Sequence, residues 1–269
     1  MTALRVTPLT PGIGAEISGI DLAKPIGGET REALSQALAE HLALVFHDQS
    51  LTPAQYLAAA EAFGPPMRQH YSQHHMEGFP DIGLVWHRNG QRPAERWHTD
   101  HTNREKPPAA TMLYGVEIPS AGGATSVANM RAAFNALPAE EQRRLERLRT
   151  VNTLDERTDT RTEDVEQFGA PIVHPMVRTH PVHGSKAVFF HISKAVVEGM
   201  APDAGKAYMA DLIERMIHPE IVYRHDWRKG DVLVIDDRAT MHRAHGDYDR
   251  RESRVLWRII VEGDRPYLV

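Results

Sequence analysis

Residues 230–242 read GDVLVIDDRATMH and carry the strongest indication of the fold. Gly230-Asp231 ends a turn, and the four apolar residues 232–235 that follow are typical of a buried strand bounded by turn residues. Asp236-Asp237-Arg238 then turns the chain toward Met241-His242. A histidine placed just past such a strand has a rigid support, which a metal ligand requires. The alternative is that His242 only makes hydrogen bonds within its own loop.

Eight other segments have the composition of short strands, rich in valine, isoleucine and aromatic residues and bounded by turn residues. They are residues 42–46, 82–86, 111–118, 125–128, 172–177, 187–191, 221–224 and 254–261. The strands do not alternate regularly with helices, which argues against a doubly wound parallel sheet. Many short strands with helices set aside predict a mainly β fold, a sandwich or jelly roll with helical insertions.

Four regions are predicted to be helical. Residues 29–42 and 203–217 have apolar positions at helical spacing, and residues 129–148 predict two helices joined at Leu137-Pro138. Thr52-Pro53-Ala54-Gln55 predicts a capping box with proline at the first helical position, opening a helix that runs to about Phe63. We find no repeat, low-complexity tract or Gly/Ser linker, so we expect a single domain over residues 1–269.

Composition restricts the function. The net charge of −5 argues against nucleic acid as the main partner, although a local arginine cluster could still bind a small anion. There are no cysteines and 16 histidines, so a bound metal must have nitrogen and oxygen ligands. The first residues do not resemble a secretory signal, and no apolar run approaches the roughly 18 residues of a membrane span. We therefore expect a cytoplasmic protein that does not bind membranes.

The sharpest local motif is His98-Thr99-Asp100. In an extended segment, residues i and i+2 point to the same side, so this histidine and this aspartate can share one ion. Two histidines and one carboxylate on one face of an octahedron leave three open positions, the arrangement found in non-haem Fe(II) oxygenases. We take His242 as the third ligand.

This motif alone is weak evidence, because a surface His and Asp could simply make local hydrogen bonds. Three rival pairs occur, and the first of them fits a polar loop better than a metal site: His245-Gly246-Asp247, His75-Met76-Glu77 and His218-Pro219-Glu220.

Arg254 and Arg258 lie four residues apart in a predicted strand, so both can point into one cavity. A planar guanidinium binds a carboxylate through two parallel hydrogen bonds. A buried arginine needs an anionic partner, because an unpaired buried charge is costly. The alternative, a strand whose arginines both face solvent, stays open from the pattern alone.

Taken in order, the motifs resemble the taurine dioxygenase family, which also includes 2,4-dichlorophenoxyacetate and other aryloxyalkanoate dioxygenases. The resemblance runs almost from end to end. It rests on GAEISGIDL (14–22), LVFHDQSLTPAQ (44–55), WHTD (97–100), GGAT (122–125), GDVLVIDDRATMHRA (230–244) and RVLWRIIVEG (254–263).

This resemblance implies a double-stranded β-helix, or jelly roll, and an Fe(II)- and 2-oxoglutarate-dependent dioxygenase that consumes O2. His98, Asp100 and His242 fall on the family's iron ligands. Thr125 and Arg254 fall on the residues that hold the far carboxylate of 2-oxoglutarate. The implied reaction hydroxylates a substrate carbon, with bond cleavage as a possible sequel, and releases succinate and CO2.

The resemblance also implies a substrate, a small organic anion such as a sulfonate, an aryloxyalkanoate or another carboxylate. Arg258 falls on the family's substrate arginine, and His70 and Tyr71 lie near its substrate contacts. Residues 68–74 and 101–103 are the candidate walls of this site.

There are departures from the family pattern. The usual WDNR reads IDDR at residues 235–238, and GGDT reads GGAT. Residues 92–96, RPAER, do not match the amide and acid residues that face the taurine amine in the family, which argues against taurine itself.

Two other classes remain as alternatives. A zinc-dependent hydrolase on a jelly-roll scaffold could use the same two histidines and carboxylate, with a bound water as nucleophile. It would not need an arginine and a threonine for a diacid. A non-catalytic jelly-roll binding module would not need the metal ligands. Since members of the resembling family are commonly dimers or tetramers, we expect a homo-oligomer.

Overall fold

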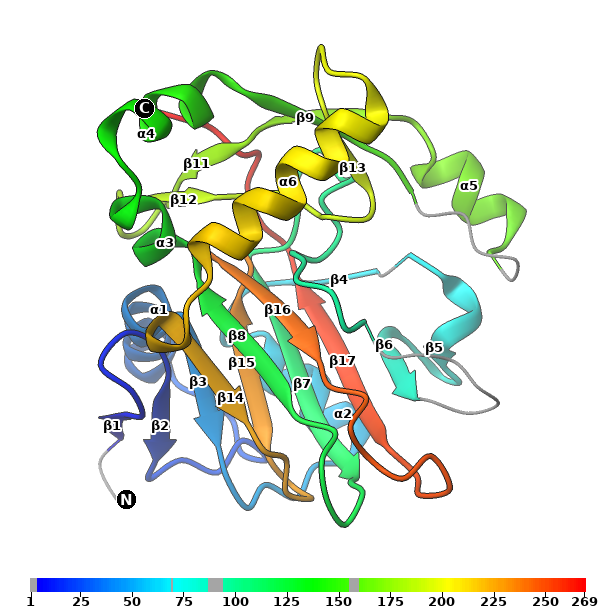
Figure 1. Cartoon of the computed structure of the whole chain (residues 1–269). Helices are drawn as coiled ribbons and strands as arrows, with labels where there is room; N and C mark the ends of the chain where they lie inside the picture. The colour runs from blue at the N-terminus through cyan, green and yellow to red at the C-terminus, as the bar shows by residue number, and fades with distance from the viewer. Residues whose placement is uncertain (1–3, 69, 87–93, 155–159) are drawn as a thin grey trace.

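The computed structural model describes residues 4–68, 70–86, 94–154 and 160–269 and is mainly β (Figure 1). The larger sheet runs in the order β1-β2-β3-β15-β7-β17-β6-β5, with β4 paired to β17 at one end. Its strands are β1 (Arg5–Pro8), β2 (Ala15–Ser18), β3 (Ala43–Phe46), β4 (Pro66–Met67), β5 (His75–Met76), β6 (Phe79–Trp86), β7 (Ala110–Glu117), β15 (Val232–Asp236) and β17 (Val255–Val261).

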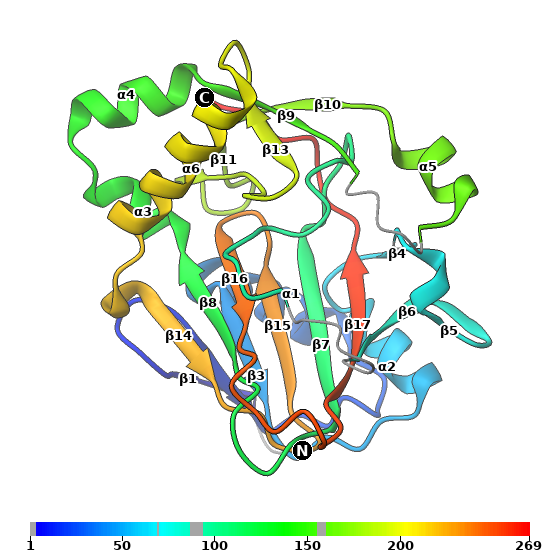
Figure 2. The same cartoon turned by 45° about the vertical axis from the view of Figure 1, so that its right-hand side comes forward.

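A smaller sheet lies against one face of the larger one, as Figure 2 shows. Its order is β14-β8-β16, with β8 (Thr125–Asn129) antiparallel to both β14 (Val222–His225) and β16 (Thr240–Ala244). The two sheets form the expected jelly roll. Short additional strands are β9 (Arg149–Asn152), β10 (Ile172–Pro175), β11 (Val177–Thr179), β12 (Lys186–Val188) and β13 (Ala195–Val197).

Strand β15 shows why the apolar run in residues 232–235 is continuous. It lies between β3 and β7, and every residue in it is buried. Val232 and Val234 pack in a core toward α1 and α2, whereas Leu233 and Ile235 pack in the core between the sheets. Both faces of this strand are covered by a hydrophobic core, so residues 232–235 are all apolar and do not alternate with polar residues.

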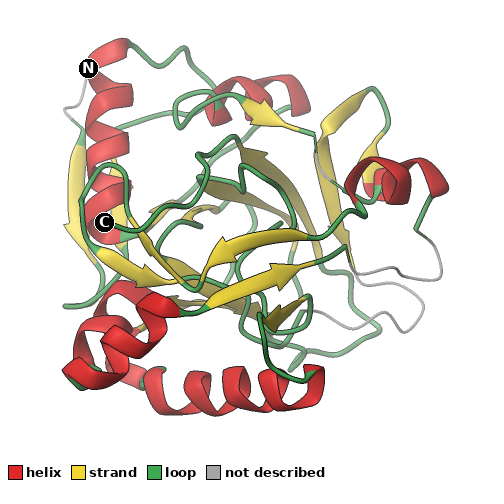
Figure 3. Ribbon diagram, turned by 90° about the horizontal axis from the view of Figure 1, so that it is seen from above, coloured by secondary structure: helices red, strands yellow, loops and turns green. Residues whose placement is uncertain are grey.

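Seen from above, the helices lie around the periphery of the strands (Figure 3). α1 (Gly28–His41) contacts β3 and β15, and α2 (Pro53–Ala60) contacts β6 and β17. The other helices are α3 (Met130–Ala136), α4 (Ala139–Arg147), α5 (Thr162–Phe168) and α6 (Pro202–Met216). Within the described ranges, no helix is both long and apolar enough to cross a membrane.

The predicted strand over residues 172–177 is wrong as a single element. β10 pairs with β9 and β11 pairs with β12, and the chain changes partner at Met176. The predicted strand at 187–191 is also shorter, since β12 ends at Val188. Changes of pairing partner depend on distant segments, which explains why local composition did not reveal them. The prediction also missed α5, the short strands β1, β2, β4, β5, β9 and β13, and β16.

The predicted capping box at Thr52 is present. The Thr52 side chain accepts a hydrogen bond from the Gln55 backbone N–H, and the Gln55 side chain accepts one from the Thr52 N–H. We expect Thr52→Ala to lower the free energy of unfolding by about 1 kcal/mol, because it leaves a helix N–H without its partner. Urea unfolding measures this loss. Thr7→Ala, on an exposed strand position, is the control and should change stability by less than half as much.

Candidate metal and co-substrate site

The chain crosses from the larger to the smaller sheet between β15 and β16. Asp236 holds this turn together: its carboxylate accepts hydrogen bonds from the Arg238 backbone and side chain and lies 3.0 Å from Nε2 of His180. Thr240 Oγ1 donates to the Asp236 carbonyl at 2.8 Å. His242 thus lies inside strand β16, which excludes the alternative of a loop histidine.

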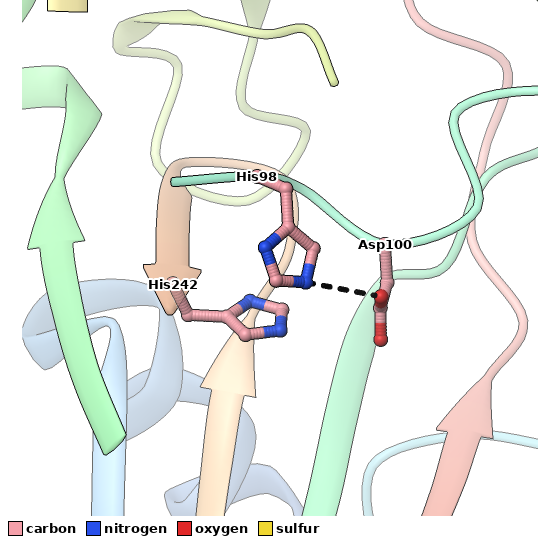
Figure 4. A group of neighbouring side chains, drawn as sticks. All are labelled: His98, Asp100 and His242. Atoms are coloured by element: carbon pink, nitrogen blue, oxygen red, sulfur yellow. Dashed lines mark ion pairs between the residues drawn. The ribbon is translucent and has the colours of Figure 1, made fainter. Parts of the chain in front are cut away.

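His98 is paired with His242 through the backbone. The His98 N–H donates to the His242 carbonyl at 3.0 Å, and the His242 N–H donates to the His98 carbonyl at 2.8 Å. Directly opposed residues of an antiparallel pair bring their side chains together. The two imidazole rings accordingly have centroids 4.3 Å apart (Figure 4).

Asp100 completes the group from the same segment as His98. Its Oδ1 is 3.8 Å from Nε2 of His98, and one candidate ligand atom from each of the three residues lies within 4.8 Å of the others. Nδ1 of His98 is 2.8 Å from the Arg96 carbonyl, so Nδ1 carries the proton and Nε2 is left for a metal. Two imidazoles and one carboxylate, all buried, are a fitting donor set for Fe(II).

The protonation states also suit a metal. Burial, and then His98, lowers the pKa of His242 to about 3, and burial lowers the pKa of His98. Burial raises the pKa of Asp100, but Arg258 and the neighbouring histidines outweigh it and hold that pKa well below its usual range. At neutral pH the site therefore offers two neutral imidazoles and one carboxylate, the forms that bind metal.

Arg254 is buried beside the GGAT turn, with only 1% of its surface exposed. Its Nε donates to the Gly123 carbonyl at 2.8 Å, while Nη1 and Nη2 are buried and have no hydrogen-bond partner among the described residues. Gly123 has φ +70° and a Cβ there would lie 3.1 Å from the Arg254 side chain, so glycine is needed for this approach. The unpaired end of the guanidinium fits a carboxylate.

Thr125 begins β8 close to this turn. Its Oγ1 accepts a hydrogen bond from Nε1 of Trp227 at 3.0 Å. Indole nitrogen only donates, so the threonine hydroxyl keeps its own proton for an acceptor. Burial lowers the pKa of Arg254 to about 10, which still leaves it charged at neutral pH.

Arg258 lies beside the carboxylate of Asp100. Its Nη1 donates to Oδ2 of Asp100 at 3.1 Å, and its side chain is 22% exposed. Asp236, an acidic residue of the β15–β16 turn, is paired with Arg238 and His180.

His70 has both ring nitrogens engaged. Arg104 Nε donates to Nε2 of His70 at 2.6 Å, and Nδ1 of His70 is 3.0 Å from Nδ1 of His101. Since arginine cannot accept, His70 carries its proton on Nδ1 and donates it to His101. Burial, and then Arg104, lowers the pKa of His70 to about 2. His70 can therefore line a substrate site as a neutral ring, but it offers no spare donor there.

Sequence reasoning missed two residues near the site, His191 and Lys194. The His191 ring lies 5.2 Å from that of His98, and its Nδ1 accepts from the Ser193 N–H, which leaves Nε2 protonated. Lys194 donates to the hydroxyl of Tyr71 at 3.3 Å. His191 was predicted at a strand end, but nothing in its local sequence indicated that this segment folds back over the metal ligands.

The rival His-Gly-Asp pair is not part of the candidate metal-binding group. His245 is bonded to Ser126 and Arg224, and Asp247 accepts from the Gly123 N–H at 2.9 Å. Asp247 thereby braces the turn that faces Arg254. Among the described residues, neither HxE pair belongs to a group of possible metal ligands. Gln69, Arg92 and Pro93, which the sequence analysis singled out, lie outside the described residues.

The chain is similar to several known proteins. The chain is 33% identical to the alpha-ketoglutarate-dependent 2,4-dichlorophenoxyacetate dioxygenase of Cupriavidus pinatubonensis, over 92% of this chain and 94% of that one. It is 32% identical to an alkylsulfatase of Acinetobacter baylyi, over 97% and 86%. The crystal structure of a taurine dioxygenase from Burkholderia xenovorans superposes with a TM-score of 0.84 at 31% identity, covering 98% of this chain and 90% of that one.

A structure of AAD-2 in complex with Mn(II) and N-oxalylglycine superposes with a TM-score of 0.83 at 30% identity, covering 99% and 100% of the two chains. The jelly roll, the group of two histidines and one carboxylate, and these relatives together identify the chain as an Fe(II)- and 2-oxoglutarate-dependent dioxygenase. Within that class, the chain belongs to the taurine catabolism dioxygenase TauD, TfdA family, whose model matches residues 5–260.

Proposed function

We propose that His98, Asp100 and His242 hold the Fe(II) of this dioxygenase, and that Arg254 and Thr125 bind the far carboxylate of 2-oxoglutarate. The substrate in this proposal is a small organic anion that is hydroxylated at carbon. Where that carbon bears oxygen, nitrogen or sulfonate, hydroxylation leads to cleavage of the bond. The supporting observation is Arg254, a buried cation whose two Nη atoms have no hydrogen-bond partner among the described residues and whose Nε holds the turn that leads into Thr125.

Fe(II), 2-oxoglutarate and O2 together supply the oxidation, in which the 2-oxo acid becomes succinate and CO2 and the substrate carbon gains a hydroxyl. The chain supplies positions and charges. His98 and His242 are held side by side by their backbone pair, so their ring geometry is set before any ligand arrives. Arg258 orients the Asp100 carboxylate through Oδ2 and leaves Oδ1 on the side of His98.

The charges around the site support an anionic substrate. Arg104, Lys194 and Arg258 all lower the pKa of His70, after burial itself, so each of these cations acts on this region. Several relatives have names that specify anionic substrates. They include the 2,4-dichlorophenoxyacetate dioxygenase, a sulfate ester dioxygenase of Pseudomonas putida and a sulfonate dioxygenase of Saccharomyces cerevisiae.

A succinate-release screen tests this proposal. The protein is incubated with Fe(II), 2-oxoglutarate and O2, and sulfonates, aryloxyalkanoates, alkyl sulfates and amino acids are compared with neutral compounds of similar size. We expect an anionic class to give the largest substrate-stimulated release of succinate. A zinc hydrolase would instead give a product without consuming 2-oxoglutarate, and a binding module would give no product.

Arg258→Ala tests where the substrate acid lies. We expect the substrate-stimulated rate to fall for every anionic substrate, by roughly 30-fold or more, because losing one partner of a buried charge pair costs on the order of 2–5 kcal/mol. Succinate release with and without substrate measures it. Substrate-independent 2-oxoglutarate turnover should fall less than the substrate-stimulated rate, because Arg254 and Thr125 are intact and the iron site loses only the hydrogen bond to Oδ2 of Asp100. A neutral compound as best substrate, or a variant whose defect is in 2-oxoglutarate affinity, would contradict this placement.

A further inference from the structure

Residue 237 departs from the motif that the sequence resembles, because an aspartate stands where asparagine is usual. Asp237 lies in the turn between β15 and β16, five positions before His242, and is fully buried. Its backbone N–H donates to the Ala109 carbonyl at 3.1 Å, which fixes it beside the metal ligands. The function proposed above gives this carboxyl group no role.

Two buried polar atoms without partners face each other here. Oδ1 of Asp237 and Nδ1 of His242 are 3.9 Å apart. Within the described part of the chain, neither atom makes a hydrogen bond, although both are inaccessible to solvent. Buried polar groups are nearly always paired, so two unpaired atoms this close need an explanation. The gap exceeds a hydrogen bond by roughly 0.7 Å, which a small rotation of either side chain removes.

The other carboxyl oxygen of Asp237 connects to the third ligand. Thr111, on β7, places its Oγ1 2.6 Å from Oδ2 of Asp237 and 3.3 Å from Oδ2 of Asp100. Asp237 therefore lies near two of the three candidate ligands: its Oδ1 is 3.9 Å from Nδ1 of His242, and the Thr111 hydroxyl that holds its Oδ2 is also 3.3 Å from Oδ2 of Asp100. If Asp237 only stabilised the turn, its hydrogen bond with Thr111 would be sufficient. The position of its Oδ1 next to the His242 ring would then have no function.

Comparison of the two histidines makes the role specific. Nδ1 of His98 is held by the Arg96 carbonyl at 2.8 Å, which leaves Nε2 for the metal. His242 has no backbone carbonyl on its Nδ1 in the described structure. Metal-binding histidines almost always donate their second N–H to a carboxylate, carbonyl or water, and this contact fixes the tautomer and the ring orientation.

We propose that Asp237 is the positioning residue for His242: its Oδ1 accepts the hydrogen bond of the His242 Nδ1–H, so that Nε2 is the metal ligand, and its Oδ2 is held by the Thr111 hydroxyl. This inference rests on the proposed ligand set. It requires only an acceptor oxygen at Oδ1. An asparagine, whose amide oxygen also accepts, can therefore replace Asp237, but an apolar residue of similar size cannot.

The test compares Asp237→Asn with Asp237→Leu in the full-length protein. Calorimetric titration with Co(II), and with Fe(II) under anaerobic conditions, gives the metal affinity. We expect Asp237→Leu to weaken metal binding about 10–100-fold, the usual effect of losing such an outer partner, and Asp237→Asn to stay within a few-fold of the parent. The visible spectrum of the Co(II) protein should be shared by the parent and Asp237→Asn and altered in Asp237→Leu, which a purely structural role would not cause.

Thr111→Val covers the case in which Asp237→Leu does not fold. Valine has the shape of threonine but no hydroxyl, so Thr111→Val should weaken metal binding severalfold. Thr179→Val, at a buried threonine on β11, is the control and should leave metal binding unchanged. Unchanged affinity and spectrum in Asp237→Leu, or in Thr111→Val where the former does not fold, would overturn the inference. So would an Asp237→Asn variant as impaired as Asp237→Leu. If His242→Ala left the metal affinity unchanged, the proposed ligand set would be wrong, and not only the role of Asp237.

Discussion

His242→Ala is expected to abolish 2-oxoglutarate-dependent succinate formation and to weaken Fe(II) binding by more than about 100-fold. Loss of an outer partner of a ligand already costs up to that factor, and this variant removes a ligand itself. The remaining pair, His98 and Asp100, comes from one segment with an Oδ1–Nε2 separation of 3.8 Å. Anaerobic Fe(II) titration gives the affinity, and a coupled succinate assay gives the activity.

His245→Ala is the matched control for this prediction. It removes a histidine only three residues further along the chain, in the rival His-Gly-Asp motif, whose ring contacts Ser126 and Arg224. We expect its Fe(II) affinity to stay within a few-fold of the parent. If His245→Ala lost iron while His242→Ala retained it, the ligand assignment would be wrong.

Arg254→Ala is expected to raise the 2-oxoglutarate concentration needed for half-maximal turnover by about 30-fold to a few thousand-fold. Truncating one partner of a buried, charge-assisted pair costs on the order of 2–5 kcal/mol, and each 1.4 kcal/mol is a factor of ten. Fe(II) affinity measured without 2-oxoglutarate should hardly change, because Arg254 makes its bond to Gly123 and not to a metal ligand. Succinate release over a range of 2-oxoglutarate concentrations measures the shift.

Two further variants sharpen this result. Arg254→Lys keeps the charge but loses the planar fork, so its requirement for 2-oxoglutarate should lie between those of the parent and Arg254→Ala. Arg215→Ala, an exposed arginine on α6, should behave like the parent. An unchanged 2-oxoglutarate requirement in Arg254→Ala would show that the co-substrate binds elsewhere.

Local sequence was sufficient where a chain segment determines its own environment. The apolar residues 232–235 predicted β15, and Thr52-Pro53-Ala54-Gln55 predicted the start of α2, since a buried strand and a capping box are both read from neighbouring residues. The same holds for the proline that separates α3 from α4. These elements are defined by spacing, which the printed sequence contains.

Contacts between distant segments could not be predicted from the local sequence. The backbone pair of His98 with His242 joins segments more than 140 residues apart in the chain, and only the ordered motifs of the resembling family suggested that they meet. Nothing in the local sequence indicated that the His191 ring would lie near His98, or the Asp237 carboxyl group near His242. The bond between Arg104 and His70 likewise determines the tautomer of His70, which no pattern of residue types encodes.

The most direct test of the central claim is an anaerobic titration of the Fe(II)-loaded protein with 2-oxoglutarate, followed by visible absorption. A 2-oxo acid that binds Fe(II) through its keto and carboxylate oxygens gives a charge-transfer band. We predict that this band appears, saturates with one 2-oxoglutarate per chain, and is absent in His242→Ala under the same conditions. A folded, iron-loaded protein that develops no band, or an equal band in His242→Ala, would contradict the claim that His98, Asp100 and His242 form the iron site of this dioxygenase.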